Sequence, residues 1–308
     1  MERKGRRGAN WSMLIVVVMM SGLTSWQSTP IANNSIYGSF GPEGLRLREQ
    51  LWVLPSADPS FALRATLFRP ETAGNEPTPL VIINHGTDES TRESVAMPVF
   101  YWLSRWFVDR GYAVLIPQRR GHGATAGTFA EAIDNCQSPD HARAGDAAAD
   151  DIAAVLNFIK MQPFIDKTRI FVAGVSTGGW ASLALAARNP PELRGVINFA
   201  GGRGAYANGR SNSICGAGNL IEAAGRFGST AKVPTLWLYS ENDSYFDPDV
   251  AKSMAKSWTK GGGQAEFLAL PAYGSEGHRI ADDRAGWRLW GTAVEKFIHY
   301  TRLAGSEF

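Results

Sequence analysis

The sequence predicts an α/β protein with a mainly parallel, doubly wound sheet and an antiparallel hairpin at its N-terminal side. Short apolar runs alternate with helical patterns along most of the chain, which is typical of strands joined by crossover helices. Two runs, PLVIINHG at residues 79–86 and YAVLIPQ at 112–118, are almost continuously apolar, as expected for strands buried on both faces. The 308 residues are enough to bury one large core.

The first elements are predicted by alternation. Residues 45–56 and 61–70 alternate apolar and polar side chains on either side of a short turn, which predicts an antiparallel hairpin. The strand at 79–86 comes next, and the segment 99–110 then has a helical pattern that Gly111 ends.

The rest of the chain repeats a strand–helix order. After the strand at 112–118, a glycine-rich loop leads to a long helix whose apolar residues recur at helical spacing. Further strands are expected at 169–175, 194–200, 234–240 and 265–271, and further helices at 142–162, 178–189, 219–227, 247–260 and 285–300. No internal repeat or linker divides the chain. The gap from 201 to 232 has room for a loop and a helix, so a single domain over 29–308 without a large cap domain is expected.

The first 28 residues predict a secretory signal peptide. The basic stretch RKGRR at residues 3–7 precedes the 11-residue apolar run MLIVVVMMSGL at 13–23, and small and polar residues follow. Such a run is shorter than the ~20 residues of a membrane-spanning helix. Because no clean A-x-A cleavage site follows, an uncleaved N-terminal membrane anchor stays open. The protein is expected to be exported, either to the periplasm or as a secreted protein.

Charge and composition narrow the classes of binding partner that the sequence predicts. The net charge is +2, but the first 28 residues carry a net +3, so the remainder is close to −1 and offers no basic surface for nucleic acid. The two cysteines lack metal-ligand spacing, and neither a metal nor a cofactor is expected. The expected partner is a small molecule, and the oligomeric state stays open.

Cys136 and Cys215 are expected to form a disulfide. Cys136 lies in the loop after the strand at 112–118, and Cys215 in the loop after the strand at 194–200. Both loops leave the carboxyl edge of the predicted sheet, where a bond could brace the rim of a site. An even cysteine count fits an oxidising compartment. Two unrelated buried thiols are the alternative.

The segment GVSTGGW, residues 174–180, follows a predicted strand and opens a predicted helix. Glycines two residues before and two after Ser176 permit a tight turn that holds the serine above the sheet. Glycine and serine are also ordinary loop residues, so the pattern alone is weak. Its strand-to-helix context predicts that Ser176 is a nucleophile.

A serine nucleophile needs a base, and the base needs an orienting carboxylate. Asp243 follows the strand at 234–240, in the turn ahead of a helix, and is the predicted acid. Asp247 precedes Pro248 and is expected to cap that helix, which makes it the reserve. Of the five histidines, His278 follows the last strand and is the predicted base.

Two backbone N–H groups should face the oxyanion of an acyl-transfer intermediate. One is expected from Thr177, at the N-terminus of the nucleophile helix, where the helix dipole favours negative charge. The other is expected from Thr87, after the strand-end segment NHG, with Gly86 allowing close approach of the backbone. His85 would then be structural.

Other residues near the site have weaker signals. In RRGHGAT, residues 119–125, Arg120 is expected to tie down a turn through buried hydrogen bonds, and a substrate-binding role for Arg120 or His122 is the alternative. Trp180, Tyr206 and Phe246 are close enough in sequence to line a pocket, and ordinary core packing would explain each of them equally well.

These segments together resemble the α/β-hydrolase superfamily over nearly all of the chain after the signal peptide. NHG, RGHG, GVSTGG, ENDSYF and EGH occur in this order at predicted strand ends. The path from ATLFRP to PLVIINHG is similar to dienelactone-hydrolase-like esterases and to the catalytic domains of prolyl-oligopeptidase-type peptidases. The resemblance implies an α/β-hydrolase fold and a serine hydrolase with a Ser-Asp-His triad.

Two departures limit what the resemblance implies. Dienelactone hydrolases use cysteine where this chain has Ser176, so their substrate does not carry over. The peptidases have a large domain ahead of the hydrolase domain, and no room for one is expected here. The predicted function is therefore hydrolysis of carboxylic esters through an acyl-enzyme. An exported peptidase or amidase with the same triad is the alternative, and a non-catalytic binding module is a third hypothesis.

Overall fold

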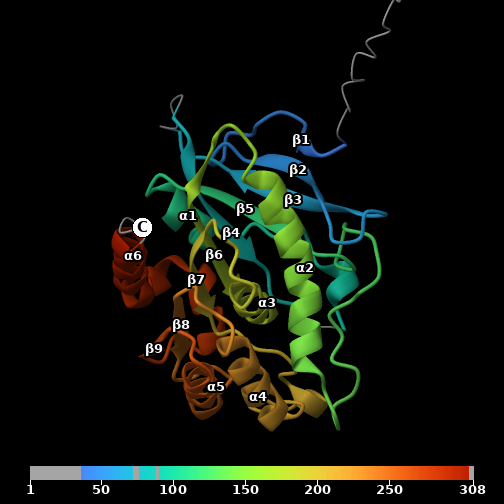
Figure 1. Cartoon of the computed structure of the whole chain (residues 1–308), viewed down its shortest axis with the longest axis vertical. Helices are drawn as coiled ribbons and strands as arrows, with labels where there is room; N and C mark the ends of the chain where they lie inside the picture. The colour runs from blue at the N-terminus through green and yellow to red at the C-terminus, as the bar shows by residue number, and fades with distance from the viewer. Residues whose placement is uncertain (1–35, 72–75, 88–89, 305–308) are drawn as a thin grey trace, which may run out of the picture. The chain divides into compact units, whose positions relative to one another are not determined.

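The computed structural model describes residues 36–71, 76–87 and 90–304, without the side chains of 302–304 (Figure 1). The predicted signal peptide at 1–28 lies outside the described residues. Within the described ranges, no helix is both long enough and apolar enough to cross a bilayer.

Among the residues that the structure describes, nine strands form one sheet in the spatial order β1-β2-β3-β5-β4-β6-β7-β8-β9. The pairs β1–β2, β2–β3 and β3–β5 are antiparallel, and every pair from β5 to β9 is parallel. The strands are β1 Gly38–Phe40, β2 Gln50–Pro55, β3 Ala62–Phe68, β4 Thr78–Asn84, β5 Ala113–Gln118, β6 Ile165–Val175, β7 Leu193–Phe199, β8 Thr235–Ser240 and β9 Ala265–Leu270.

Helices cover both faces of this sheet (Figure 1). Helices α1 and α6 pack against one face, and α2, α3, α4 and α5 pack against the other. The helices are α1 Tyr101–Val108, α2 His141–Ile159, α3 Thr177–Ala186, α4 Ala217–Gly228, α5 Pro248–Gly261 and α6 Trp287–Ala304, with 3-10 turns η1 Arg92–Ser94, η2 Ala207–Gly209, η3 Gly277–Asp282 and η4 Arg284–Gly286. The predicted α/β class with a mainly parallel sheet is confirmed.

The central strand β4 shows why its sequence is continuously apolar. Leu80 and Ile82 belong to the core under α2–α5, whereas Val81 and Ile83 belong to the core under α1 and α6. All four side chains are fully buried. A strand flanked by helices on both faces needs apolar side chains at every position, so it cannot alternate.

The antiparallel part contains one strand more than the predicted hairpin. β2 and β3 form that hairpin, with Leu54 opposite Leu63. β1 adds a short third strand, in which Gly38 faces Val53. With three residues and no buried side chain, β1 has no apolar pattern by which it could be predicted.

The parallel order brings the carboxyl ends of β4, β6 and β8 to the same edge of the sheet. The loops that follow these strands carry Thr87, Ser176 and Asp243. The fold therefore gathers residues that are far apart in the sequence at one edge.

Candidate active site

Ser176 occupies a sharp turn between β6 and α3. Its backbone has φ 56° and ψ −125°, a conformation that residues with a side chain rarely adopt. Its N–H donates to the carbonyl of Phe199 at 3.0 Å, and its own carbonyl accepts from the N–H of Trp180 at 3.1 Å, which begins α3. Bonds to the neighbouring strand and to the helix thus hold the strained turn.

Two glycines let the backbone pack around this turn. A Cβ at Gly178 would lie 2.1 Å from the carbonyl oxygen of Asn84, and a Cβ at Gly86 would lie 2.8 Å from the Cβ of Ser176. Any larger residue at either position would push the loop after β4 away from the serine. The glycines therefore bring the 85–87 loop into contact with the predicted nucleophile.

The structure brings Asp243 and His278 together across 35 residues of sequence. His278 Nδ1 lies 3.1 Å from Oδ1 and 3.0 Å from Oδ2 of Asp243. The same carboxylate accepts the N–H groups of Tyr245 at 2.8 Å and Phe246 at 3.0 Å, and the residue is 2% exposed. Asp243 is thus fixed by its own turn and directed at the histidine.

Asp247, the reserve, has a different position. It is the N-cap of α5, and its carboxylate accepts the N–H of Asp249 at 2.7 Å and of Val250 at 3.2 Å. Pro248 occupies the first helical position, as the sequence predicted. The two aspartates therefore separate into one that holds a histidine and one that caps a helix.

His278 lies on the 3-10 turn η3 and not in an open loop, because Glu276 caps the turn by accepting the N–H of His278 at 2.9 Å. Burial alone would raise the pKa of the Glu276 carboxyl. Hydrogen bonds from the Ser244 hydroxyl and from the backbone N–H groups of His278 and Ser244 hold this pKa below its usual value. The ring of Tyr245 stacks on the imidazole with centroids 4.1 Å apart. The Asp243 carboxylate thus holds the imidazole at its Nδ1 edge, and the Tyr245 ring packs against its face.

The two predicted oxyanion-hole residues lie at the same edge. Thr177 is the first residue of α3 and is 7% exposed. Thr87 lies in the loop after β4, and its hydroxyl lies 3.2 Å from Nδ1 of His85. Both line the same cavity, of about 1460 Å³, as do Ser176 and His278.

His85 is buried and neutral. Its Nε2 accepts the N–H of Arg119 at 3.2 Å, so the ring proton is on Nδ1, which faces the Gly86 carbonyl at 3.1 Å. Burial, followed by the charge of Arg119, lowers the pKa of His85 well below its ordinary value. The ring fills a structural position behind the loop.

The wall of the cavity combines aromatic side chains with a disulfide. Tyr206 and Phe246 line it, whereas Trp180 is fully buried in the core. Cys215 also lines the cavity and is bonded to Cys136, which confirms the predicted disulfide. No group of three or more His, Cys, Asp or Glu side chains in the described part of the chain is arranged to hold a metal ion.

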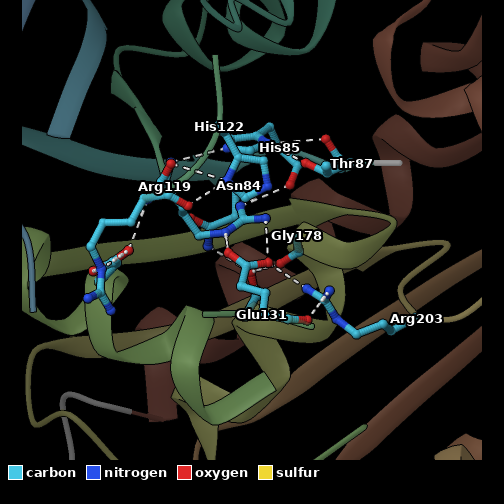
Figure 2. Close-up of polar contacts among 12 residues, drawn as sticks. Asn84, His85, Thr87, Arg119, His122, Glu131, Gly178 and Arg203 are labelled. Carbon is cyan, nitrogen blue, oxygen red and sulfur yellow. Dashed lines mark hydrogen bonds and ion pairs between the residues drawn. The ribbon is translucent and has the colours of Figure 1, made fainter. Parts of the chain in front are cut away.

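One set of site residues was not predicted. Arg119, Glu131 and Arg203 form a buried ionic cluster beside the 85–87 loop (Figure 2). Neither Glu131 nor Arg203 stands in a recognisable pattern, because each lies in a loop whose path depends on the whole fold. Arg120 behaves as predicted: its guanidinium pairs with Asp151 at 2.9 Å.

Comparison with known proteins agrees with this architecture. A family model described as X-Pro dipeptidyl-peptidase (S15 family) matches residues 60–260. The chain is similar to the structure of a candidate dipeptidyl aminopeptidase IV from Bacteroides ovatus (17% identity, TM-score 0.62, covering 82% of this chain and 35% of that one). It is also similar to an acylaminoacyl peptidase from Pyrococcus horikoshii (16%, 0.57, 85% and 41%) and to an esterase from Pyrococcus furiosus (15%, 0.59, 85% and 96%).

The chain thus spans about a third of the length of the Bacteroides peptidase and nearly all of the esterase. At these identities the likeness to solved structures shows the fold alone. The family match covers about two thirds of the sequence and includes both Ser176 and Asp243. This chain has the α/β-hydrolase fold, and it belongs to the X-Pro dipeptidyl-peptidase (S15) family.

Proposed function

We propose that this protein cleaves small carboxylic esters through an acyl-enzyme on Ser176, with His278 as the base and Asp243 as the orienting acid. The observation that carries the proposal is the Asp243–His278 pair, 3.0 Å apart, whose histidine lines the same cavity as the strained serine turn. A serine hydroxyl is inert at neutral pH without such a base.

In the first half of the reaction, His278 Nε2 takes the proton of the Ser176 hydroxyl as its oxygen attacks the ester carbonyl. The carbonyl oxygen becomes an oxyanion, which the N–H groups of Thr87 and Thr177 stabilise. Asp243 holds the proton on Nδ1 and stabilises the imidazolium. The intermediate then collapses, and His278 returns its proton to the departing alcohol, which leaves Ser176 acylated.

In the second half, water replaces the alcohol. His278 takes one proton from the water, whose oxygen attacks the acyl carbon and forms a second oxyanion in the same place. Collapse of this intermediate breaks the bond to Ser176 and returns the proton to its oxygen. The carboxylic acid leaves and the enzyme is restored.

One observation favours esters. The acidic side chains that line the cavity already have hydrogen bonds within the protein. Glu276 accepts from Ser244 and His278, Asp282 accepts from two N–H groups of α1, and Asp283 accepts from Ala285.

A second candidate function is an aminopeptidase that removes X-Pro dipeptides. The family match favours it. A non-catalytic binding module is the weakest hypothesis, because such a module has no need of a strained serine beside a paired histidine.

We also infer that the protein is exported. The Cys136–Cys215 disulfide would be reduced in most cytosols, and the N-terminal sequence has the basic and apolar regions of a signal peptide. Location of the mature protein in the periplasm or in the medium, found by fractionation, is the expected result.

The test compares the wild type with Ser176→Ala. We expect a fluorophosphonate probe to label the wild type alone, and p-nitrophenyl acetate and butyrate to be hydrolysed far faster than Gly-Pro and Ala-Pro p-nitroanilides. Ser176→Ala should lower ester turnover by several orders of magnitude with an unchanged circular dichroism spectrum. Faster cleavage of the X-Pro anilides would establish the peptidase instead. Wild-type turnover by Ser176→Ala would refute both.

A further inference from the structure

Three charged side chains from separate segments meet next to the 85–87 loop (Figure 2). Arg119 follows β5, Glu131 lies ahead of α2, and Arg203 follows β7; each is at most 2% exposed. The Glu131 carboxylate accepts from Arg119 Nε at 2.5 Å and Nη2 at 3.2 Å, and from Arg203 Nη2 at 2.5 Å. One carboxylate thus bridges two guanidinium groups.

The charges of this cluster are strongly coupled. Burial alone would raise the pKa of the Glu131 carboxyl, but the positive charges of Arg119 and Arg203 hold it far below its usual value. Glu131 is therefore ionised, and the cluster keeps a net positive charge. A buried ionic cluster stabilises a fold little compared with apolar side chains of the same volume. The effect of this cluster therefore lies in the geometry that it fixes.

Arg119 extends this geometry to the 85–87 loop. Its Nη1 donates to the carbonyl of His85 at 2.9 Å, and its backbone N–H donates to Nε2 of the same histidine at 3.2 Å. His85 in turn contacts Gly86 and Thr87 through Nδ1. The side chain of Arg119 therefore holds the carbonyl of His85, and its main chain holds the His85 ring.

Arg203 connects the same cluster to another part of the cavity wall, in the loop after β7. Its Nη1 donates to the Glu131 carbonyl at 2.7 Å, and Arg203 itself lines the cavity together with Gly204. Ile133, two residues after Glu131, also lines it. The loop after β4 and the loop after β7 are thus joined through Glu131.

We propose that Arg119, held by Glu131, is a positioning residue that aims the Thr87 N–H at the oxyanion. This inference rests on the proposed acyl-enzyme mechanism. Arginine suits the task because its planar fork reaches the carboxylate and the His85 carbonyl at once, whereas a lysine ammonium cannot do both in this geometry. A loop displaced by a fraction of an ångström would still admit substrate but would stabilise the transition state less.

The experiment separates transition-state binding from ground-state binding in the full-length protein. Two inhibitors share one carbon skeleton: an alkyl trifluoromethyl ketone, which the serine attacks to form a tetrahedral oxyanion, and the corresponding secondary alcohol, which it cannot attack. For Arg119→Lys we expect kcat on p-nitrophenyl butyrate to fall about 10-fold to 100-fold with KM within about twofold. The inhibition constant of the ketone should rise by the same factor, and that of the alcohol should stay unchanged.

Glu131→Gln provides a second variant. It keeps the size of the side chain but removes the charge that holds Arg119, so the same pattern of losses is expected. Arg120→Lys is the matched control, because Arg120 is the next residue, is also largely buried, and pairs with Asp151. It should leave kcat and the ratio of the two inhibition constants within about twofold of the wild type.

The outcomes distinguish this inference from the proposed function. If the ketone inhibits the wild type but not Ser176→Ala, the mechanism stands, and equal weakening of ketone and alcohol in Arg119→Lys and Glu131→Gln overturns the positioning role. An unchanged kcat in both folded variants also overturns it. If the ketone does not inhibit the wild type, the acyl-enzyme mechanism itself fails, and the positioning role fails with it.

Discussion

Asp243 and Asp247 are four residues apart, yet their surroundings differ. Asp243 sits in a tight turn after β8, where its N–H donates to the carbonyl of Ser240 at 3.1 Å and its side chain turns toward His278. Asp247 precedes a proline that starts α5, and its carboxylate faces the free N–H groups of that helix. An N-cap carboxylate stabilises a helix, whereas a carboxylate beside imidazole fixes a tautomer.

This difference gives the first prediction. Asp243→Asn should lower kcat on p-nitrophenyl butyrate by about 10⁴-fold, because a neutral amide can neither stabilise the imidazolium nor hold the proton on Nδ1. Asp247→Asn should retain activity within about twofold, since asparagine caps helices nearly as well as aspartate. Steady-state kinetics of the two variants decides between them, and a reversed result would make Asp247 the acid.

The disulfide joins two of the segments that surround the cavity. Cys215 donates its N–H to Gly204 at 2.9 Å, and its carbonyl lies 2.8 Å from Nε2 of His141, the first residue of α2. The carbonyl of His141 accepts from the indole N–H of Trp180 in α3. The bond therefore links the cavity wall to the helix that follows Ser176.

Breaking this bond should loosen the wall. The bond closes a segment of 79 residues, for which chain entropy gives about 4–5 kcal/mol as an upper value. We expect a Cys136→Ser/Cys215→Ser double variant to melt at a lower temperature than the wild type and to have a higher KM for esters. Scanning calorimetry with and without dithiothreitol gives the melting temperatures, and steady-state kinetics gives the KM values.

The double variant is also the control, because the reductant should not change its melting temperature. Peptide mapping of the unreduced wild type should recover the linked peptides. Two free thiols in protein purified from the periplasm or medium would contradict both the bond and the inferred export.

Protonation of buried histidines couples the stability of the whole fold to pH. Burial and then the charge of Arg119 lower the pKa of His122 to about 4. Its Nδ1 faces two backbone carbonyls, and its ring meets His85 and Phe129 edge-on. The Glu131 carboxylate opposes the shift but does not cancel it. In the folded state the ring is therefore neutral at physiological pH.

A depressed histidine pKa makes the fold less stable in acid, because the unfolded chain binds the proton first. The contribution of neutral His122 to the free energy of unfolding is fully present above about pH 6.5 and is lost as the pH falls toward 4. For a shift of this size, about 2 kcal/mol of it is gone by pH 5. His122→Asn should flatten the fall in free energy of unfolding between pH 7 and 5, measured by urea denaturation. His299→Asn, at an exposed position of α6, should keep the wild-type slope. Equal slopes of the free energy of unfolding against pH in all three proteins would contradict the assignment of this pH dependence to His122.

Most of the fold could be predicted because its signals are local. Periodicity distinguishes buried strands from amphipathic helices, and the glycines around Ser176 mark a turn that other residues cannot form. The order of serine, aspartate and histidine at strand ends then indicated one edge of the sheet. The pairing of Asp243 with His278 depends only on residues next to those strand ends, so it too was predictable.

The ionic cluster and the short strand β1 required the tertiary structure. Glu131 lies between Arg119 and Arg203 because three loops of irregular path converge, and no period or motif records where such loops meet. β1 exists because its backbone pairs with β2, a bond that any sequence can make. Sequence patterns report how each segment buries its own side chains, whereas contacts between loops depend on the path of the entire chain. The contacts of Arg119 and Arg203 with Glu131 were decided at that level.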